Sequence, residues 1–299
     1  MGKCNKKSKF KSYLEDYLFM LPYLAIFFVF TVLPVVIAIV LSFTYFNVLQ
    51  APSFTGISNY VNLIVNDTLF MKAFKNTLVL AVVTGPAGFF LSLLLAWLIN
   101  EFGPKTRAIL TLLFYAPSIS GGAYMIWQII YSGDSYGYLN GILLNLNIIY
   151  TPIQWTTDST YMMVAAIIVI IWLSFGAGFL SFIAGFKNID KRLYEAAAVD
   201  GLRNRWQELW YITLPTMKPQ LTFGAVMSIT GAFGMGDVIT AIFGFPSTDY
   251  ALHTLVHHMQ DYGNQRYEMG YACAVAVILF LLMVGTNSIV KRMLRNIGN

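Results

Sequence analysis

Six long apolar stretches alternate with shorter polar segments along the chain. They lie at about residues 17–43, 77–99, 108–130, 161–183, 221–242 and 270–290. A bilayer core of about 30 Å needs roughly 20 helical residues to cross it, and a helix satisfies its own backbone hydrogen bonds in lipid. The pattern therefore predicts an all-α membrane protein with six transmembrane helices.

Lys and Arg are unevenly distributed among the polar segments. Because basic residues accumulate in cytoplasmic loops, their positions predict that both termini and the segment 184–220 are cytoplasmic. The expected organisation is a basic tail over 1–16, a transmembrane domain over 17–292 that includes the loop 184–220, and a tail over 293–299. All but three of the 19 basic residues lie on this predicted side: Lys3, Lys6, Lys7, Lys9, Lys11, Lys105, Arg107, Lys187, Lys191, Arg192, Arg203, Arg205, Lys218, Lys291, Arg292 and Arg295.

The composition agrees with a membrane protein. Hydrophobic residues make up 57% of the chain and charged residues 11%, whereas soluble domains carry about a quarter charged residues. The net charge of +5 follows from the cytoplasmic segments, so nucleic-acid binding is not expected. Cys4 and Cys273 are far apart in sequence and predict no disulfide framework. The first apolar stretch is longer than a signal-peptide core and is expected to remain as a helix.

Prolines and glycines interrupt several of the predicted spans. Pro22, Pro34, Pro86 and Pro117 fall within them, and glycines cluster in "TGPAGFF", "SFGAGF" and "TGAFGMG". Small residues let helix backbones approach closely, and proline kinks are tolerated where neighbours satisfy the freed backbone groups. The pattern fits either tight packing of the bundle or kinked helices around a moving pathway.

The predicted cytoplasmic loop 184–220 has a helical pattern of its own. Asp190 is a plausible N-cap for "KRLYEAAAV", and Gly201 is an unfavourable residue for a helix interior. We therefore expect two short helices that break at Gly201, with Pro215 ending the second. The apolar residues that recur at helical spacing are Leu193, Ala197, Val199, Leu202, Trp206, Leu209 and Trp210. By periodicity alone, this stripe could simply lie in the lipid headgroup layer.

The amino-acid sequence of this loop resembles the EAA loop of ABC importer permeases. That motif pairs Glu-Ala-Ala with a Gly six positions after the Glu and ends in Ile-x-Leu-Pro. The residues that match are Glu195, Ala196, Ala197, Asp200, Gly201, Ile212, Leu214 and Pro215. One residue more than usual separates Gly201 from Ile212, and we expect it to lengthen the turn.

The rest of the chain is similar to the carbohydrate-uptake branch of these permeases, the relatives of the maltose permease. The similarity spans about residues 17–292 and includes "NRWQELWYITLP" and "GDVITAIFGFPSTDYALHTLVHHMQDYGNQRYEMGYACAVAVIL". The resemblance implies a type I importer permease fold in the plasma membrane of a prokaryote. It implies a sugar or oligosaccharide as the transported solute, with a glycerol phosphate as the nearest alternative.

The resemblance also implies partners. In that family the two short helices dock on a cytoplasmic ABC ATPase dimer, with Glu195 making the charged contact, Ala196 and Ala197 permitting close approach, and Gly201 making the turn. A second, non-identical permease and an extracytoplasmic solute-binding protein complete such importers. This chain lacks a Gly-x-x-x-x-Gly-Lys-[Ser/Thr] phosphate loop, so ATP and Mg²⁺ are expected at the partner ATPase and no cofactor on this chain.

Five side chains are candidates for the solute pathway. Sugars are held by hydrogen-bonding groups beside aromatic faces, and "GGAYMIWQII" supplies Tyr124, Trp127 and Gln128. Tyr124 and Gln128 are four residues apart, which would place them on one helix face. The other candidates are Trp172 and Asp237, although aromatic residues in membrane helices are equally explained by packing or interface anchoring.

Other functional classes are less well supported. Asp237 is the one ionisable residue within a predicted span, whereas ion-coupled transporters place several such groups in the membrane. His253 and His257 have a spacing compatible with a metal, but no accompanying Glu completes a site, and we expect a solvated or partner-facing helix instead. No nucleophile, base and orienting group occur together, so an enzyme is not expected.

Overall fold

The computed structural model describes the backbone of residues 6–295 and the side chains of residues 17–295. The expected tails over 1–16 and 293–299 thus fall partly outside the described residues. The chain divides into two compact units, one formed by residues 1–66 and 259–278 and the other by residues 67–258 and 279–299. Each unit is helical in its described part, apart from one pair of two-residue strands in the first unit.

The first unit contains the first predicted span. Helix α1 (Lys6–Phe27), the π-helical turn η1 (Phe28–Val32) and α2 (Leu33–Leu41) follow one another, and the part over Tyr17–Leu41 is long and apolar enough to cross a membrane. Strands β1 (Thr44–Tyr45) and β2 (Ser53–Phe54) pair antiparallel, with Thr44 opposite Phe54. The remaining elements of this unit are α3 (Ser58–Val61), η2 (Asn62–Asn66), η6 (Asp261–Gln265) and the first part of α16 (Met269–Arg295).

A close backbone contact fixes the β1 loop against the start of α16. The Gly270 N–H donates to the Phe46 carbonyl at 3.1 Å, and a Cβ at Gly270 would lie 2.0 Å from the Thr44 carbonyl oxygen. The buried Asn59 amide donates to the carbonyls of Ser42 and Thr44, both at 2.9 Å. These hydrogen bonds satisfy the backbone groups that the short strands leave unpaired.

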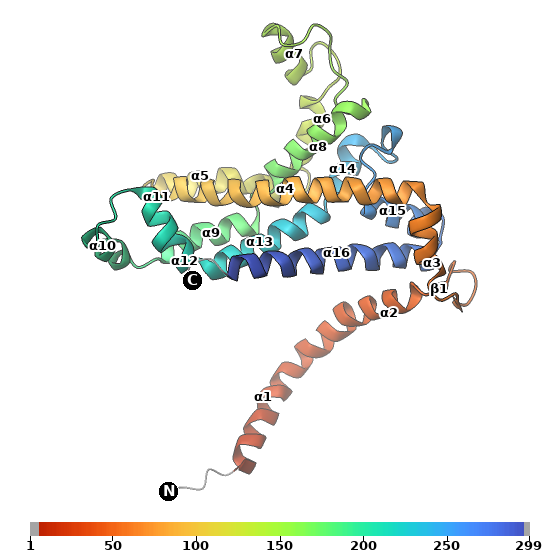
Figure 1. Ribbon diagram of the computed structural model, residues 1–299, viewed down its shortest axis with the longest axis horizontal. Helices are drawn as coiled ribbons and strands as arrows, with labels where there is room; N and C mark the ends of the chain where they lie inside the picture. Colours follow the sequence, from red (N-terminus) through yellow and green to blue (C-terminus); the bar gives the residue numbers. More distant parts are fainter. Residues whose placement is uncertain (1–5, 296–299) are drawn as a thin grey trace. The chain divides into compact units, whose positions relative to one another are not determined.

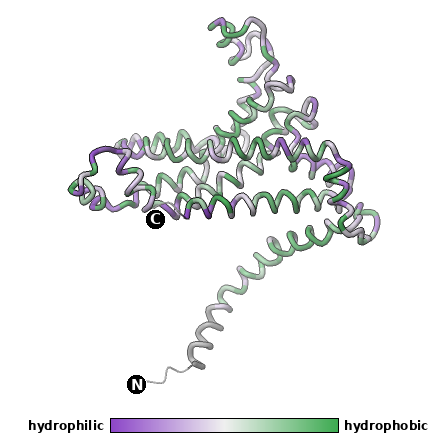
Figure 2. The backbone as a smooth tube through the Cα atoms, in the orientation of Figure 1, coloured by the Kyte–Doolittle hydropathy of each residue, from purple (hydrophilic) through white to green (hydrophobic). Residues whose placement is uncertain are grey.

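The second unit contains four of the remaining spans and the later part of α16 (Figures 1 and 2). Helix α4 (Thr68–Asn100) is a single long apolar helix, as is α16. Three further spans are pairs of helices bent at a short break. They are α5 (Pro104–Ile119) with η3 (Ala123–Met125) and α6 (Ile126–Ile130), α8 (Ser159–Leu173) with α9 (Ala177–Asn188), and α13 (Lys218–Phe233) with α14 (Gly236–Phe243). Counting each bent pair as one gives six spans, which agrees with the predicted fold class.

Three of the predicted spans are bent. The chain turns by 87° between Ile119 and Ala123, by 42° between α8 and α9, and by 43° between α13 and α14. The last two breaks fall at the glycines of "SFGAGF" and "TGAFGMG". The predicted span over 108–130 is interrupted, because the chain leaves helical geometry at Ser120 and Gly122.

Small residues also pack the bundle tightly. A Cβ at Gly178 of α9 would lie 3.2 Å from the Cα of Gly224 in α13, and one at Gly88 of α4 would lie 2.7 Å from the Ser174 Cβ. The small residues thus serve packing at some positions and lie at helix breaks at others.

The remaining elements of the second unit are short. They are α7 (Tyr138–Asn145), α10 (Lys191–Val199), α11 (Arg205–Glu208), η4 (Leu209–Thr213), α12 (Leu214–Thr216), η5 (Thr248–Tyr250) and the start of α15 (Leu255–Gln260). One apolar core lies around Val169 and Ile239, and a second lies around Phe179, Phe182 and Leu221. The second core includes Leu209 and Leu214, and so it anchors the loop 184–220 to the spans.

Candidate functional site

The first short helix of the loop, α10, has well-defined ends. Asp190 caps it by accepting a hydrogen bond from the Arg192 N–H at 3.0 Å. At its other end the Gly201 N–H donates to the Ala198 carbonyl and the Leu202 N–H to the Ala197 carbonyl, while Gly201 has φ of +98°. This is a Schellman motif, which requires a left-handed residue where glycine is favoured. The N-cap at Asp190 and the break at Gly201 are confirmed.

The second short helix is α11 with its π-helical extension η4. Asn204 caps it by accepting from the Gln207 N–H at 2.8 Å, and the Gln207 side chain in turn accepts from the Arg203 N–H at 3.0 Å. The Leu214 N–H donates to the Leu209 carbonyl, five residues back, because this turn is π-helical. The expectation that Pro215 ends this helix is wrong, because Pro215 lies inside α12 (Leu214–Thr216), in the first turn, where its missing N–H is tolerated.

The π-helical turn bears on the extra residue between Gly201 and Ile212. A π turn contains one residue more than an α turn, and it lies within this interval. The chain can therefore accommodate the additional residue in either of two places. One is the turn after Gly201, as predicted. The other is the helix itself, just before Pro215.

The matched residues divide into an exposed and a buried set. Glu195, Ala196, Asp200 and Gly201 are exposed, whereas Ala197 and Leu214 are buried within the unit. Ile212 and Pro215 are half-buried. Thus Ala196 is open to close approach by another surface, but Ala197 packs against this chain's own residues.

The apolar stripe of the loop is not a single face. Ala197 and Leu209 point inward, while Val199 is 88% exposed and Trp210 67% exposed. Trp206 and Tyr211 are also exposed. Exposed large apolar side chains that cluster on a few turns mark a contact surface for protein or lipid.

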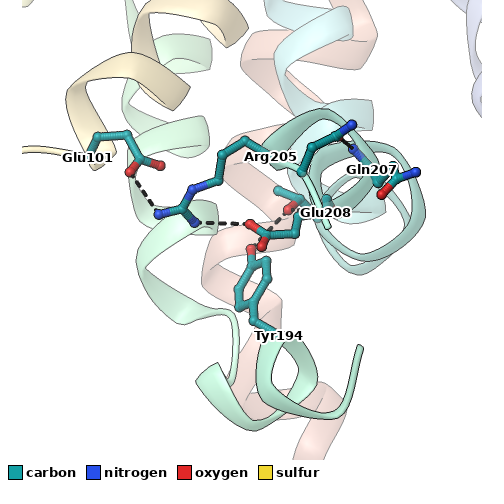
Figure 3. Close-up of polar contacts among 7 residues, drawn as sticks. Glu101, Tyr194, Arg205, Gln207 and Glu208 are labelled. Carbon is teal, nitrogen blue, oxygen red and sulfur yellow. Dashed lines mark hydrogen bonds and ion pairs between the residues drawn. The ribbon is translucent and has the colours of Figure 1, made fainter. Parts of the chain in front are cut away.

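A chain of polar contacts joins the two short helices to the end of α4 (Figure 3). The Tyr194 hydroxyl lies 2.9 Å from the Thr213 hydroxyl, and the Thr213 hydroxyl donates to the Glu208 carbonyl at 3.1 Å. Arg205 pairs with Glu208 at 2.9 Å and with Glu101 at 3.3 Å. The hydrogen bond to Glu208, followed by the charge of Glu101, raises the pKa of Arg205, so this guanidinium stays charged. A cavity of about 710 Å³ lies beside these residues and is also lined by Arg107, Lys187 and Glu195.

The predicted pathway residues lie in a different part of the second unit. Trp127 and Trp172 pack edge to face with ring centroids 5.7 Å apart, and Tyr124 and Trp127 border the core around Val169. The Gln128 amide donates to the Ala241 carbonyl of α14, and Asp237 is exposed in the first turn of the same helix. The Trp127 indole N–H is buried without a hydrogen-bond partner among the described residues.

A small cavity of about 170 Å³ lies where two spans break. Its lining includes Ser174 and Gly176 at the α8–α9 break, Met235 at the α13–α14 break, and Thr84 and Ser228. None of the five predicted pathway residues lines it. The glycine clusters of the sequence carried the signal for this site, since they mark the breaks around which the cavity forms.

The three histidines are buried, so the expectation of a solvated helix is wrong. The His257 ring accepts or donates at Nδ1 with the Thr254 hydroxyl at 2.8 Å and at Nε2 with the Thr240 hydroxyl at 3.0 Å. His258 pairs with Asp67 at 3.1 Å. Leu252 and Leu255 of the same segment are also buried. Across the described residues, no three His, Cys, Asp or Glu side chains are arranged to hold a metal ion.

Together, the bundle of bent spans and the exposed helical loop define a multi-pass α-helical membrane protein with exposed apolar side chains on that loop. Residues 13–298 match the family described as the inner membrane component of binding-protein-dependent transport systems, and the chain belongs to this family. It is therefore a transport subunit and not an enzyme in itself.

Named relatives agree with this assignment. The chain is 32% identical to the probable ABC transporter permease YesP of Bacillus subtilis, over 91% of this chain and 88% of that protein. It is 31% identical to the arabinooligosaccharide permease AraP of Bacillus subtilis, over 90% and 84%. It is 33% identical to the lactose permease LacF of Rhizobium radiobacter, over 78% of each.

The fold is also found among solved structures. A chain of a bacterial ABC transporter that imports the acidic polysaccharide alginate superposes with a TM-score of 0.78 at 23% identity, covering 98% of this chain and 99% of that one. The fold of the chain is thus that of an ABC importer permease.

Proposed function

We propose that this chain is one of two permease subunits of an ATP-driven importer, and that the loop 184–220 docks on the ATPase subunits. The observation that carries the proposal is the exposed helix pair α10–α11, which continues through η4 and α12 directly into α13. A surface that binds a partner and is continuous with a span can move that span when the partner moves.

Four of the matched residues have roles that their environments support. Glu195 and Ala196 are exposed on α10 and would contact the ATPase, with Glu195 supplying charge and Ala196 permitting close approach. Gly201 sets the angle between the two short helices through its left-handed backbone. Buried Leu214 and Met217 hold α12 against the core, so that displacement of the loop is passed to α13.

The solute is proposed to be an oligosaccharide. The names of AraP and LacF assign arabinooligosaccharides and lactose to those relatives. A solute-binding protein outside the membrane would deliver the sugar, and a second, non-identical permease would complete the pathway. The cavity at the two helix breaks supports a pathway there, since irregular backbone at membrane depth is tolerated where it lines a cavity or is buried in protein.

The energy source is proposed to be ATP hydrolysed by the partner. ATP and Mg²⁺ would bind only to the ATPase dimer, whose closure would swing the spans toward an outward-open state and whose reset would return them. The predicted orientation, with the loop and both termini in the cytoplasm, is the one that this mechanism needs. An ion-coupled transporter is the rival class.

The experiment is reconstitution of the complex with its ATPase, second permease and binding protein. We expect oligosaccharide-loaded binding protein to stimulate ATP hydrolysis and uptake, and Glu195→Ala to weaken both. The control is Glu268→Ala, which removes a carboxylate between η6 and α16, outside the loop 184–220, and should leave both unchanged. Uptake that survives ATP depletion but collapses with an ionophore would assign the chain to ion-coupled transport instead.

A further inference from the structure

Helix α4 differs from the bent spans in running without a break between two contact regions. It comprises 33 residues, which correspond to a length of about 50 Å. One end lies beside the loop 184–220 and the other beside the segment 249–258, as Figure 1 shows for α4, α11 and α15. All of these residues belong to the second unit.

At the loop end, α4 contacts the second short helix through three kinds of interaction. The rings of Trp97 and Trp206 are 5.0 Å apart, and Glu101, the residue that follows α4, pairs with Arg205 at 3.3 Å. Ala96 and Ile99 lie in the same apolar core as Leu209. The core contact fixes the position of η4, while the two side-chain pairs link the exposed helix α11 to α4.

At the other end, the first turns of α4 hold the segment 249–258 through side chains at four positions. Asp67, the N-cap of α4, accepts from the Phe70 N–H at 2.8 Å and also pairs with His258 at 3.1 Å. The Asn76 amide donates to the His253 carbonyl at 3.0 Å, and the Thr77 hydroxyl accepts from the Leu255 N–H at 2.9 Å. Lys72 donates to the carbonyl of Asp249.

We infer that α4 is a strut that passes the state of the loop 184–220 to the segment 249–258. This inference rests on the proposed function, because the loop must first respond to the ATPase. The contacts at both ends join elements far apart in sequence. Helix α4 runs as one element between them, although Pro86 inside it donates no backbone hydrogen bond, and a continuous helix transmits a displacement along its axis better than a span bent by more than 40°. Coupling between two sites is reciprocal, so a ligand at segment 249–258 would equally bias the loop.

Glu101 and Trp97 are the positioning residues for the coupling between α4 and the loop 184–220. They supply the α4 side of the contacts with Arg205 and Trp206. Changing them substitutes no residue of the loop 184–220 itself. The matched control is Glu208→Gln, which removes the other carboxylate partner of Arg205 but keeps the contact between Arg205 and Glu101.

The test is hydrogen exchange of the amides of residues 249–258 in the full complex, without nucleotide and with ATP and vanadate. We expect the exchange rates to change with nucleotide in the wild type and in Glu208→Gln. In the double variant Glu101→Gln, Trp97→Leu, the nucleotide-dependent difference should fall by roughly fivefold or more, which is the lower end of coupling between distant sites. A variant at the far end, Lys72→Met, should also reduce it while leaving the response of the loop intact.

The outcomes separate the two proposals. Loop amides over 191–213 that gain no protection from the ATPase would overturn the proposed docking and the strut with it. Protected loop amides with an unresponsive segment 249–258 in the wild type would overturn the strut alone. A double variant that keeps the full nucleotide-dependent response would overturn the strut as well.

Discussion

The two ends of α4 carry segments of opposite character. At one end, α10 exposes Val199 and η4 exposes Trp210 and Tyr211, and the polar contacts of α11 involve exposed side chains such as Arg205. At the other end, His257 is 1% exposed, and hydrogen bonds join its ring to Thr240 and Thr254. The first segment has apolar surface left for a partner, whereas the second is closed within this chain.

This difference assigns different roles to the two segments. Exposed ion pairs contribute about 0–1 kcal/mol, so the contacts of Arg205 can rearrange when a partner binds. A buried ring with satisfied hydrogen bonds resists rearrangement, because each group left unsatisfied costs about 1–3 kcal/mol. The loop is therefore suited to docking and the histidine segment to moving as a body.

The largest expected effect comes from two neighbouring residues of the loop. Leu209→Ala removes a side chain from the core and should cost about 2–5 kcal/mol, whereas Trp210→Ala should change stability by about 0.5 kcal/mol or less. Thermal unfolding of the purified permease measures both. Trp210→Ala should instead weaken co-purification with the ATPase; a destabilised Trp210→Ala protein would show that this face is part of the core.

A smaller loss is expected at His257. Replacing it with Leu leaves the Thr240 hydroxyl and the Gly236 carbonyl without their partner, which should cost about 1–3 kcal/mol. His257→Gln keeps a donor and an acceptor and serves as the control. Equal unfolding temperatures for both variants would contradict the view that polar contacts close this segment.

Changing Gly201 to Ala should lower the free energy of unfolding by about 1–2 kcal/mol, because an L-residue is strained at its φ of +98°. The control is Gly285→Ala within α16, where a Cβ meets no atom within 4 Å and helix propensity improves. Chemical denaturation compares the two. Similar midpoints would mean that the left-handed turn is not required.

The smallest effect concerns pH. Burial is the main cause that lowers the pKa of His257 from its ordinary value, against the opposing charge of Asp237. The unfolded ring binds a proton more readily than the folded one, so stability is present above about pH 6.5 and falls as the pH drops below it. Exchange protection of residues 255–258 should decline between about pH 7 and pH 5, and His257→Gln should flatten that slope. If exchange protection fell more steeply with decreasing pH in His257→Gln than in the wild type, the result would contradict a lowered pKa for His257.

The spans, the loop and the break at Gly201 could be predicted because each has a local signal. Apolar length predicted the spans, and a capping Asp190 with a mid-helix Gly201 predicted the two short helices. The bend of 87° after Ile119 could not, since an apolar run looks the same whether the helix is straight or bent. The cavity at Ser174 and Met235 also depends on how two broken spans meet.

The histidines were misjudged for a related reason. A polar segment between two spans is expected to face water, but His258 pairs with Asp67, the N-cap of α4, and His257 hydrogen-bonds Thr240 of α14. The partner Asp67 precedes α4 by one residue and carried no sign of a second role beyond N-capping. Long-range polar pairing of this kind is set by tertiary packing and leaves no periodic trace.

The most direct test of the account is hydrogen exchange of the whole permease pair with and without its ATPase. The account predicts that protection appears in the amides of α10, α11 and η4 when the ATPase binds, while residues 252–258 are already protected in its absence. Protection that appears elsewhere on the chain and leaves residues 191–213 unchanged would contradict the claim that this loop is the docking surface.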